Sequence, residues 1–333
     1  MIQMTDNMLY NSINNELTNE ATQVYNLQGQ ISSGLQINYP QDNPSGMVNV
    51  LSYKNSTALI TQYNSNVSLA NSVGSLASST ISNAIGAVNQ ASTLALEMAN
   101  GTNTQANDTS AAQQVEQIIN ELTQFADTSY NGQNIFTGNN PNLSPAYTTT
   151  TAYFSAATTS GSATPVKYQV YTYAGTDANQ NYQITQNETV TPSLTADAIF
   201  GNDPANPSGN PASSSSSYTP SGLISVLSLF QQELSSGVYQ QNSSGIIKGI
   251  QNGLNTMTAA QADIGTVVQR LNEQQTSYQT VLSNISQLLG QTQDVNVAQA
   301  MTNLTQAQES YQATLEASSD ITSLTPMLLQ YLK

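Results

Sequence analysis

Six side chains that carry oxygen atoms stand at the spacing of a twelve-residue calcium loop: Asp177, Asn179, Asn181, Gln183, Thr185 and Glu188. Such loops hold Ca²⁺ through carboxylate, amide and hydroxyl oxygens, and they need Gly at the sixth position for a sharp turn. This chain has Tyr182 at the sixth position. A polar β-turn is therefore the favoured interpretation. The weaker alternative is a metal site built on four of these residues: Asp177, Asn179, Asn181 and Glu188.

Catalytic chemistry has few residues to draw on. The chain contains no His and no Cys, which excludes the common catalytic triads, His-based zinc sites and thiol chemistry. It also lacks the G-x-x-x-x-G-K-[ST] phosphate loop. The acids Glu97, Glu116 and Glu121 fall on predicted helices, where carboxylates ordinarily face solvent. The sequence therefore predicts a protein that is not an enzyme and has no cofactor.

Charge excludes two further classes of partner. The 333 residues carry a formal net charge of -15, with five basic residues against 20 acidic ones. So few bases cannot neutralise a row of phosphates, which argues against nucleic-acid binding. An anionic membrane would repel the chain, and no apolar run approaches the roughly 20 residues needed to span a bilayer. The abundant Ser, Thr, Asn and Gln instead favour neutral, hydrogen-bonding contacts between subunits.

Apolar residues at both ends of the chain recur at alternating steps of three and four, which is typical of coiled coils. The N-terminal row, interrupted by Glu20, is Ile13, Leu17, Val24, Leu27 and Ile31. The C-terminal row includes Val297, Met301, Leu304, Tyr311, Leu315, Leu324 and Leu328. A lone helix would leave its apolar stripe in water. We therefore expect the two terminal segments, residues 1–40 and 296–333, to pair with each other.

Two longer rows of the same kind lie further inside the chain, from Tyr63 to Met98 and from Ile250 to Leu289. With a shorter helix between about 108 and 130, they predict an α-helical bundle domain over residues 41–135 and 220–295. Gln261 and Gln275 interrupt the second row. Edge positions of the coiled coil are the favoured interpretation of these amides, and register-setting contacts are the alternative.

Between residues 136 and 219, the spacing of apolar residues changes from that of helices to that of strands. The segments TTTTAYFSAA and VKYQVYTYA predict short strands, and GNDPANPSGNPASSSSS predicts a turn-rich loop. The fold class is therefore mainly α with a β-rich insert. Its expected parts are a long antiparallel helical bundle or coiled coil, formed by the N- and C-terminal segments, and a central β domain.

The segment ISSGLQINYPQDNPSGM, residues 31–47, interrupts the helical rhythm. Its two glycines permit special backbone geometry, and its two prolines end helical continuation and stiffen the link. We expect Asp42 or Ser45 to cap a helix that starts near Met47. The residues predicted to form this connector are Gly34, Gln36, Pro40, Asp42, Asn43, Pro44 and Gly46.

The connector resembles the flagellin superfamily pattern of Ser-Ser-Gly, a basic residue, Ile, Asn and a paired Asp-Asp before a long helix. The tail DVNVAQAMTNLTQAQESYQATLEASSDITSLTPMLLQYL is similar to the flagellin C-terminus. The segments NGQNIFTGNNPNLSPAY and VYTYAGTDANQNYQITQNETVTPSLTADAIFG resemble those of the hook-associated protein 3 subgroup, as does the ending SLTPMLLQYL. Two residues of the connector depart from the superfamily pattern: Gln36 stands in place of the basic residue, and Asn43 stands in place of the second Asp. A neutral amide hydrogen bond is expected there instead of an ionic contact.

The resemblance implies a structural subunit of the bacterial flagellum, secreted and placed at the junction of hook and filament. The partners it implies are other copies of the chain, the first hook-filament junction protein, flagellin, an export chaperone on the C-terminal segment and the type III export apparatus. In this family the terminal helices are disordered until assembly. A flagellin filament subunit is the nearest alternative, and a surface adhesin that displays the β domain is the alternative of a different class.

Overall fold

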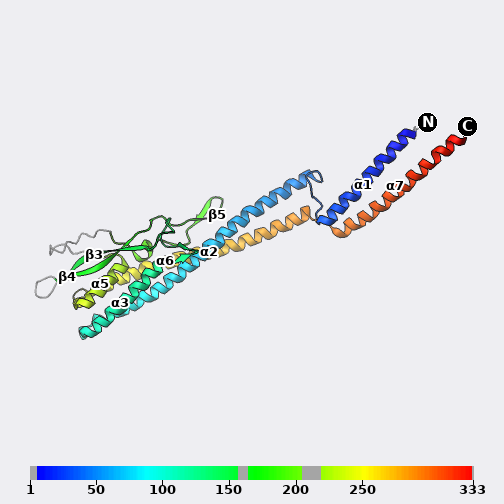
Figure 1. The fold of residues 1–333 in the computed structure, drawn as a ribbon. Helices are drawn as coiled ribbons and strands as arrows, with labels where there is room; N and C mark the ends of the chain where they lie inside the picture. Colours follow the sequence, from blue (N-terminus) through cyan, green and yellow to red (C-terminus); the bar gives the residue numbers. More distant parts are fainter. Residues whose placement is uncertain (1–5, 157–163, 205–218, 332–333) are drawn as a thin grey trace. The chain divides into compact units, whose positions relative to one another are not determined.

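The computed structural model describes residues 6–156, 164–204 and 219–331 (Figure 1). Its helices are α1 (Asp6–Ser33), α2 (Pro44–Met98), α3 (Gln105–Ala126), α4 (Ala196–Phe200), α5 (Leu223–Ser236), the 3-10 turn η1 (Tyr239–Gln241), α6 (Ser243–Gln293) and α7 (Val297–Tyr331). Its strands are β1 (Ser129–Tyr130), β2 (Gln133–Asn134), β3 (Tyr147–Ala156), β4 (Thr164–Tyr173), β5 (Tyr182–Thr185) and β6 (Glu188–Val190). Within these ranges, no helix is both long and apolar enough to cross a membrane.

The chain divides into two compact units. The first comprises residues 1–61 and 279–333, and the second comprises residues 62–278. The divisions fall inside the long helices α2 and α6. The division into three domains expected from the sequence is finer than this one and stays a prediction.

The first unit is built around α1 and α7, which lie side by side (Figure 1). Glu20 in the middle of α1 contacts Ser310 of α7, and Leu35 just after α1 bridges to Asp294 just before α7. Residue numbers therefore rise along one helix as they fall along the other, so the pair is antiparallel. This confirms that the two terminal segments pair with each other.

The second unit contains one large apolar core. Helix α3 packs against α5, and α5 packs against β4. Along α2, the predicted row is buried at every position from Val67 to Met98. Many of these residues are Ala, which lets neighbouring helices approach closely. Helix α6 packs closely against α5 at Gly253, where a Cβ would lie 2.6 Å from the Leu223 side chain.

The described residues form three separate two-stranded antiparallel sheets: β1–β2 lies just before the predicted insert, and β3–β4 and β5–β6 lie within it. Strands β3 and β4 pair over ten successive positions, from Tyr147 opposite Tyr173 to Ala156 opposite Thr164. They match the two segments predicted as strands. Hairpins β1–β2 and β5–β6 are shorter, and the second contains an irregularity in its register. The fold class predicted from the sequence is therefore confirmed: mainly α with a β-rich insert.

One element of the insert escaped the sequence analysis. Helix α4 lies in the range predicted to be β, with Thr195 as its N-cap and with Ile199 and Phe200 buried. Five residues are too few for a helical period to be recognised. The predicted turn-rich loop lies mostly outside the described residues.

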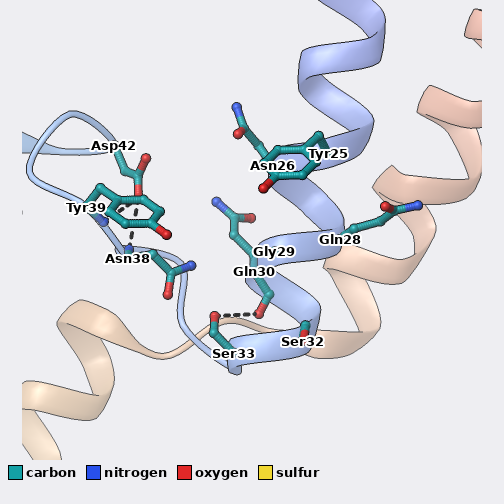
Figure 2. A pocket seen from close by; sticks show the side chains of 10 residues that line it. All are labelled: Tyr25, Asn26, Gln28, Gly29, Gln30, Ser32, Ser33, Asn38, Tyr39 and Asp42. Carbon is teal, nitrogen blue, oxygen red and sulfur yellow. Dashed lines mark hydrogen bonds between the residues drawn. The ribbon is translucent and has the colours of Figure 1, made fainter.

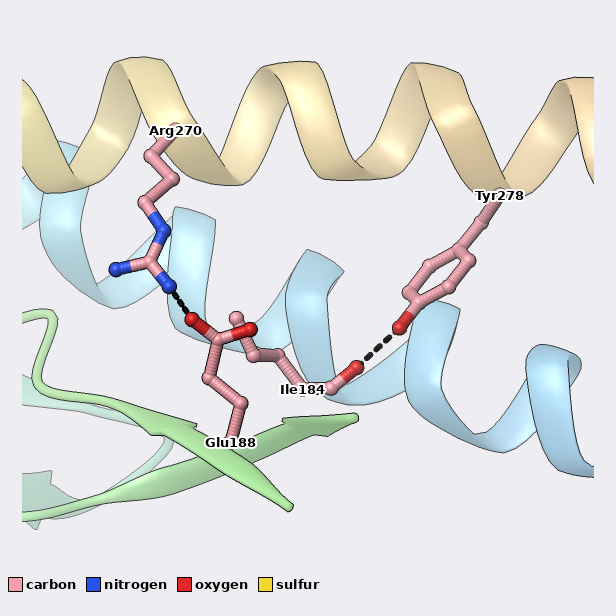
Figure 3. A network of polar contacts seen from close by, with 4 residues as sticks. All are labelled: Ile184, Glu188, Arg270 and Tyr278. Carbon is pink, nitrogen blue, oxygen red and sulfur yellow. Dashed lines mark hydrogen bonds and ion pairs between the residues drawn. The ribbon is translucent and has the colours of Figure 1, made fainter. Parts of the chain in front are cut away.

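The β5–β6 hairpin is fastened to α6 by two polar contacts (Figure 3). The Tyr278 hydroxyl of α6 donates a hydrogen bond to the Ile184 carbonyl, and Arg270 of α6 forms an ion pair with Glu188. Both partners of the ion pair are about half exposed, so this pair contributes little to stability. Tyr278 is buried, so the loss of its hydrogen bond would leave a buried carbonyl unpaired, at a cost of about 1–3 kcal/mol.

Candidate functional site

The candidate site is the terminal pair, defined as α1 and α7, together with the connector. On α1, the predicted row is half-buried while almost every residue between its members is exposed. Glu20 interrupts this row, and its Oε1 accepts a hydrogen bond from the Ser310 hydroxyl at 2.6 Å. The polar position in the apolar row is thereby matched by a polar residue on the partner helix.

On α7, the side chains that turn inward differ in part from the predicted row. The buried or half-buried positions are Ala300, Leu304, Ala307, Tyr311, Thr314 and Ser318. Val297, Met301 and Leu315 instead stay exposed, at 45%, 54% and 43%. Ala300 takes the inward place predicted for Met301, and Thr314 takes that predicted for Leu315, so the row is displaced by one residue at these two positions. Leu324 and Leu328 lie beyond the side chains that the structure describes.

Large apolar side chains that remain exposed are concentrated in the first unit. Twelve of the fourteen found among the described side chains belong to it: Met8, Tyr10, Tyr25, Tyr39, Val48, Leu51, Leu59, Val281, Leu288, Val297, Met301 and Leu315. The other two, Leu69 and Leu96, belong to the second unit. Exposed apolar patches mark sites of protein association. The first unit therefore has the surface expected of an assembly interface.

The N-cap of α2 differs from the prediction. Asn43 caps this helix, because its Oδ1 accepts a hydrogen bond from the Gly46 N–H at 2.9 Å. The expectation that Asp42 or Ser45 would be the cap was wrong. Pro44 is the first residue of α2, where its missing N–H costs nothing and its fixed φ favours the helix. The prediction that this proline ends a helix was therefore also wrong.

Asp42 has a different task in the connector. Its Oδ2 accepts hydrogen bonds from the backbone N–H groups of Asn38 at 2.9 Å and Tyr39 at 2.8 Å. The carboxylate thereby fixes the turn that contains Pro40. Gly46 lies inside α2, and a Cβ there would come within 2.7 Å of the Ile37 side chain. This glycine therefore supplies space for packing, and not the turn geometry that the sequence suggested.

The connector is tied to the segment that joins α6 to α7. The Gln36 N–H donates to the Gln293 carbonyl at 2.7 Å, and the Val295 N–H donates to the Gly34 carbonyl at 2.9 Å. The Gln36 side chain also donates to the Thr292 carbonyl at 3.2 Å, which is the neutral amide contact expected there. Gly34 has φ +74°, a conformation that favours glycine.

A pocket of about 360 Å³ lies between the end of α1 and the connector (Figure 2). Its lining combines two exposed aromatic rings with neutral amides, hydroxyls and one carboxylate: Tyr25, Asn26, Gln28, Gly29, Gln30, Ser32, Ser33, Asn38, Tyr39 and Asp42. One oxygen of the carboxylate is already engaged by the connector backbone. The remaining groups offer hydrogen bonds and aromatic surface without a basic residue, which suits contact with another polypeptide better than capture of an anion.

Three of the four residues in the weaker metal hypothesis are engaged elsewhere or exposed, and the fourth, Asn179, has a buried side-chain oxygen without a hydrogen-bond partner in the described residues. Arg270 engages the Glu188 carboxylate, and the Asn181 side-chain oxygen accepts a hydrogen bond from the Thr191 hydroxyl at 2.6 Å. Asp177 is exposed. Within residues 6–156, 164–204 and 219–331, no group of three or more acidic, His or Cys side chains is placed to hold a metal ion.

The other predicted polar positions lie where the simpler interpretations put them. Glu97, Glu116 and Glu121 are exposed on their helices. Gln261 and Gln275 are half-buried, as coiled-coil edge positions would be. An amide contact between α2 and α6 is made instead by Asn71, which donates to the Asn272 side-chain oxygen at 2.9 Å. Neither asparagine interrupts the row of apolar residues on its helix, so the sequence contained no indication of this contact.

Two buried acids, Asp203 and Glu233, were missed in the sequence. Glu233 of α5 is fully buried, and its Oε1 accepts a hydrogen bond from the Asn242 amide at 2.8 Å. Its Oε2 has no hydrogen-bond partner in the described part of the chain. Burial raises the pKa of Glu233 to about 7, against the opposing effect of the Asn242 hydrogen bond. Glu233 stands in the row of apolar residues along α5, three residues after Phe230, and this position was the sequence signal for its burial.

Two protein-family models match the chain. The bacterial flagellin N-terminal helical region matches residues 4–141, and the bacterial flagellin C-terminal helical region matches residues 247–332. Together they cover about two thirds of the sequence. No curated protein sequence matches the chain.

Several solved structures share the fold. A protein described as a flagellar hook-associated protein from Vibrio parahaemolyticus is 13% identical, with a TM-score of 0.59 over 76% of this chain and 100% of that one. Flagellar hook-associated protein 3 from Legionella pneumophila is 14% identical, with a TM-score of 0.55 over 73% of this chain and 97% of that one. FlgL from Bacillus cereus is 14% identical, with a TM-score of 0.51 over 72% and 97% of the two chains.

The two glycines near the end of α1 yield opposite predictions. Gly34→Ala should destabilise the first unit by about 1 kcal/mol, because a Cβ is disfavoured at positive φ. Gly29→Ala should stabilise it by up to about 1 kcal/mol, because this residue is helical and a Cβ would meet nothing within 4 Å. Amide hydrogen exchange in α1 and α7 measures both effects. Equal effects of the two substitutions would contradict the assigned role of Gly34.

The buried Glu233 yields a pH-dependent prediction. Because its pKa is higher in the folded chain than its ordinary value of 4.5, stability should fall as pH rises from about 4.5 to 7 and then stay low. Glu233→Gln should therefore stabilise the second unit at pH 8, by about 3 kcal/mol at most, and have little effect at pH 4. Denaturant unfolding at both pH values measures this. The exposed Glu121→Gln is the control, and a gain of Glu233→Gln that is the same at both pH values would contradict the prediction.

Proposed function

Since this chain belongs to the bacterial flagellin family, we propose that it is a flagellar structural subunit of the hook-associated protein 3 type, which joins the hook to the flagellin filament. The observation that carries the proposal is the apolar surface of the first unit, where the exposed large apolar side chains gather. The family's N- and C-terminal helical regions, matched at both ends of the chain, supply the context. Three junction or hook-associated proteins with the same fold add support.

The first unit associates with neighbouring subunits through surfaces that the single chain leaves open. Two stripes run along α7: one packs against α1, and the other, containing Val297, Met301 and Leu315, remains exposed. At about 25 cal/mol per Å², a few hundred Å² of buried apolar surface contributes several kcal/mol per contact. A repeated contact of this kind that does not close on itself builds a helical tube.

The partners in this proposal are those of a junction subunit. They are other copies of the chain, the first hook-filament junction protein and flagellin, with an export chaperone on the C-terminal segment and the type III apparatus before assembly. The location is outside the cell, at the boundary of hook and filament. The role is structural and non-enzymatic, in keeping with acids such as Glu97, Glu116 and Glu121 that lie on exposed helix faces.

Deletion of the gene tests this role. We expect the deletion strain to secrete flagellin monomers and to build no filament, because filament growth lacks its starting surface. Labelled protein in the wild-type strain should lie at the hook-filament boundary. Labelling along the whole filament would favour a filament subunit. A deletion strain that keeps its filament and swims normally would remove both assembly roles and leave the adhesin.

Substitutions on the outer stripe of α7 test the interface itself. Met301→Gln with Leu315→Gln should leave the free chain folded, because both side chains are already exposed, but should prevent its incorporation. Leu96→Gln is the matched control, since Leu96 is 54% exposed but belongs to the second unit. Electron microscopy of the complemented deletion strain measures the outcome. Normal filaments with the double variant would refute the role of this stripe.

A further inference from the structure

The two edges of the β3–β4 sheet differ in how their backbone groups are satisfied. On the β4 side, the N–H of Gln169 donates to the Ser228 hydroxyl at 3.1 Å, and the N–H of Tyr171 donates to the Ser225 hydroxyl at 2.8 Å. Both serines are buried residues of α5. Side chains of this helix therefore cover the outer edge of β4, which cannot accept another strand.

The backbone direction on β3 follows from this pattern. In an antiparallel pair, residues directly opposite each other alternate between those that bond to each other and those whose backbone groups point outward. Gln169 lies opposite Thr151, and Tyr171 lies opposite Thr149. Because the N–H groups of Gln169 and Tyr171 point outward, the N–H and C=O groups of Thr149 and Thr151 also point outward, on the β3 side, as do those of Tyr153.

The outer edge of β3 is open in the part of the chain that the structure describes. Strand β3 pairs with β4 alone, and Thr149 and Thr151 are exposed. Proteins usually protect such edges with charges, Pro, bulges or short strands. Strand β3 has ten residues, a continuous register and the sequence YTTTTAYFSA, which contains no charge and no Pro. It is therefore unprotected by any of these devices.

We propose that the outer edge of β3 binds a second copy of this chain, by antiparallel pairing of β3 with the β3 of that copy. Pairing centred on Thr151 places Thr151 opposite its own equivalent and Thr149 opposite Tyr153, so the outward groups of all three residues find partners. Cross-strand Thr pairs and aromatic pairs with β-branched residues stabilise such sheets. The edge is also uncharged, so two chains of net charge -15 meet there without like charges facing each other.

The symmetry of this contact separates it from the proposed assembly role. Antiparallel pairing of identical strands has two-fold symmetry and closes after two copies. A helical tube in which all subunits point in one direction contains no such two-fold pair. The contact therefore belongs to free copies of the chain, and it stands or falls independently of the role in the flagellum.

Disulfide trapping in the full-length chain tests the pairing, because the chain has no Cys of its own. Thr151→Cys places two thiols on a hydrogen-bonded pair with Cα atoms about 5.5 Å apart, within reach of a disulfide. Gln169→Cys is the control: it is equally exposed on the same face, but about 14 Å would separate its two copies across three strand spacings. We expect covalent dimer to form at least tenfold faster with Thr151→Cys than with Gln169→Cys.

A second substitution distinguishes edge pairing from chance collision. Thr149→Pro removes an outward N–H that β4 does not use, so the β3–β4 hairpin should persist. Added to Thr151→Cys, it should abolish the excess of covalent dimer without changing the melting temperature by more than a few degrees. Equal trapping at positions 151 and 169, or trapping at 151 that survives Thr149→Pro in a folded chain, would overturn the proposal.

Discussion

A long helix with one apolar stripe cannot bury that stripe alone, and this constraint organises the whole molecule. In the second unit, α2 and α6 bury their stripes among α3, α5 and the strands of the insert, which together form one large core. In the first unit, α1 and α7 bury their apolar stripes chiefly against each other. Paired helices cover only part of each other's surface, so the first unit retains apolar side chains in water on α1 and α7, in the connector and on its parts of α2 and α6. The same constraint therefore produces both the fold of one unit and the association surface of the other.

Backbone contacts at the connector turn this pairing into a defined geometry. The Gln36–Gln293 and Val295–Gly34 hydrogen bonds hold together the segment that joins α1 to α2 and the segment that joins α6 to α7. Gly34 adopts a positive φ, Asp42 fixes the next turn, and Asn43 with Pro44 starts α2. Each contact is local, and together the contacts determine where the antiparallel pair of α1 and α7 begins. In a subunit of the proposed kind, this is the point at which neighbouring copies need the same shape.

The low content of charge has a consequence in the core as well. With five basic residues in the chain, a buried acid has few possible ionic partners, and Glu233 receives one amide hydrogen bond instead. Its raised pKa follows from that shortage, since burial favours the neutral form when nothing compensates the charge. Ionisation of Glu233 therefore destabilises the second unit as pH rises toward the pKa of this residue.

Periodicity was sufficient to predict the long helices, the β3–β4 hairpin and the pairing of the two ends, because each depends on the order of apolar and polar residues alone. It also predicted the half-buried row of α1. Contacts between segments distant in the sequence were decided by the tertiary structure. One example is the inner face of α7, which contains Ala300 and Ala307 while Met301 stays exposed. Three further features arise where separate elements pack together: the ion pair of Arg270 with Glu188, the cover of the β4 edge by two serines of α5, and the burial of Glu233. The order of apolar and polar residues along the chain does not show which elements will come into contact.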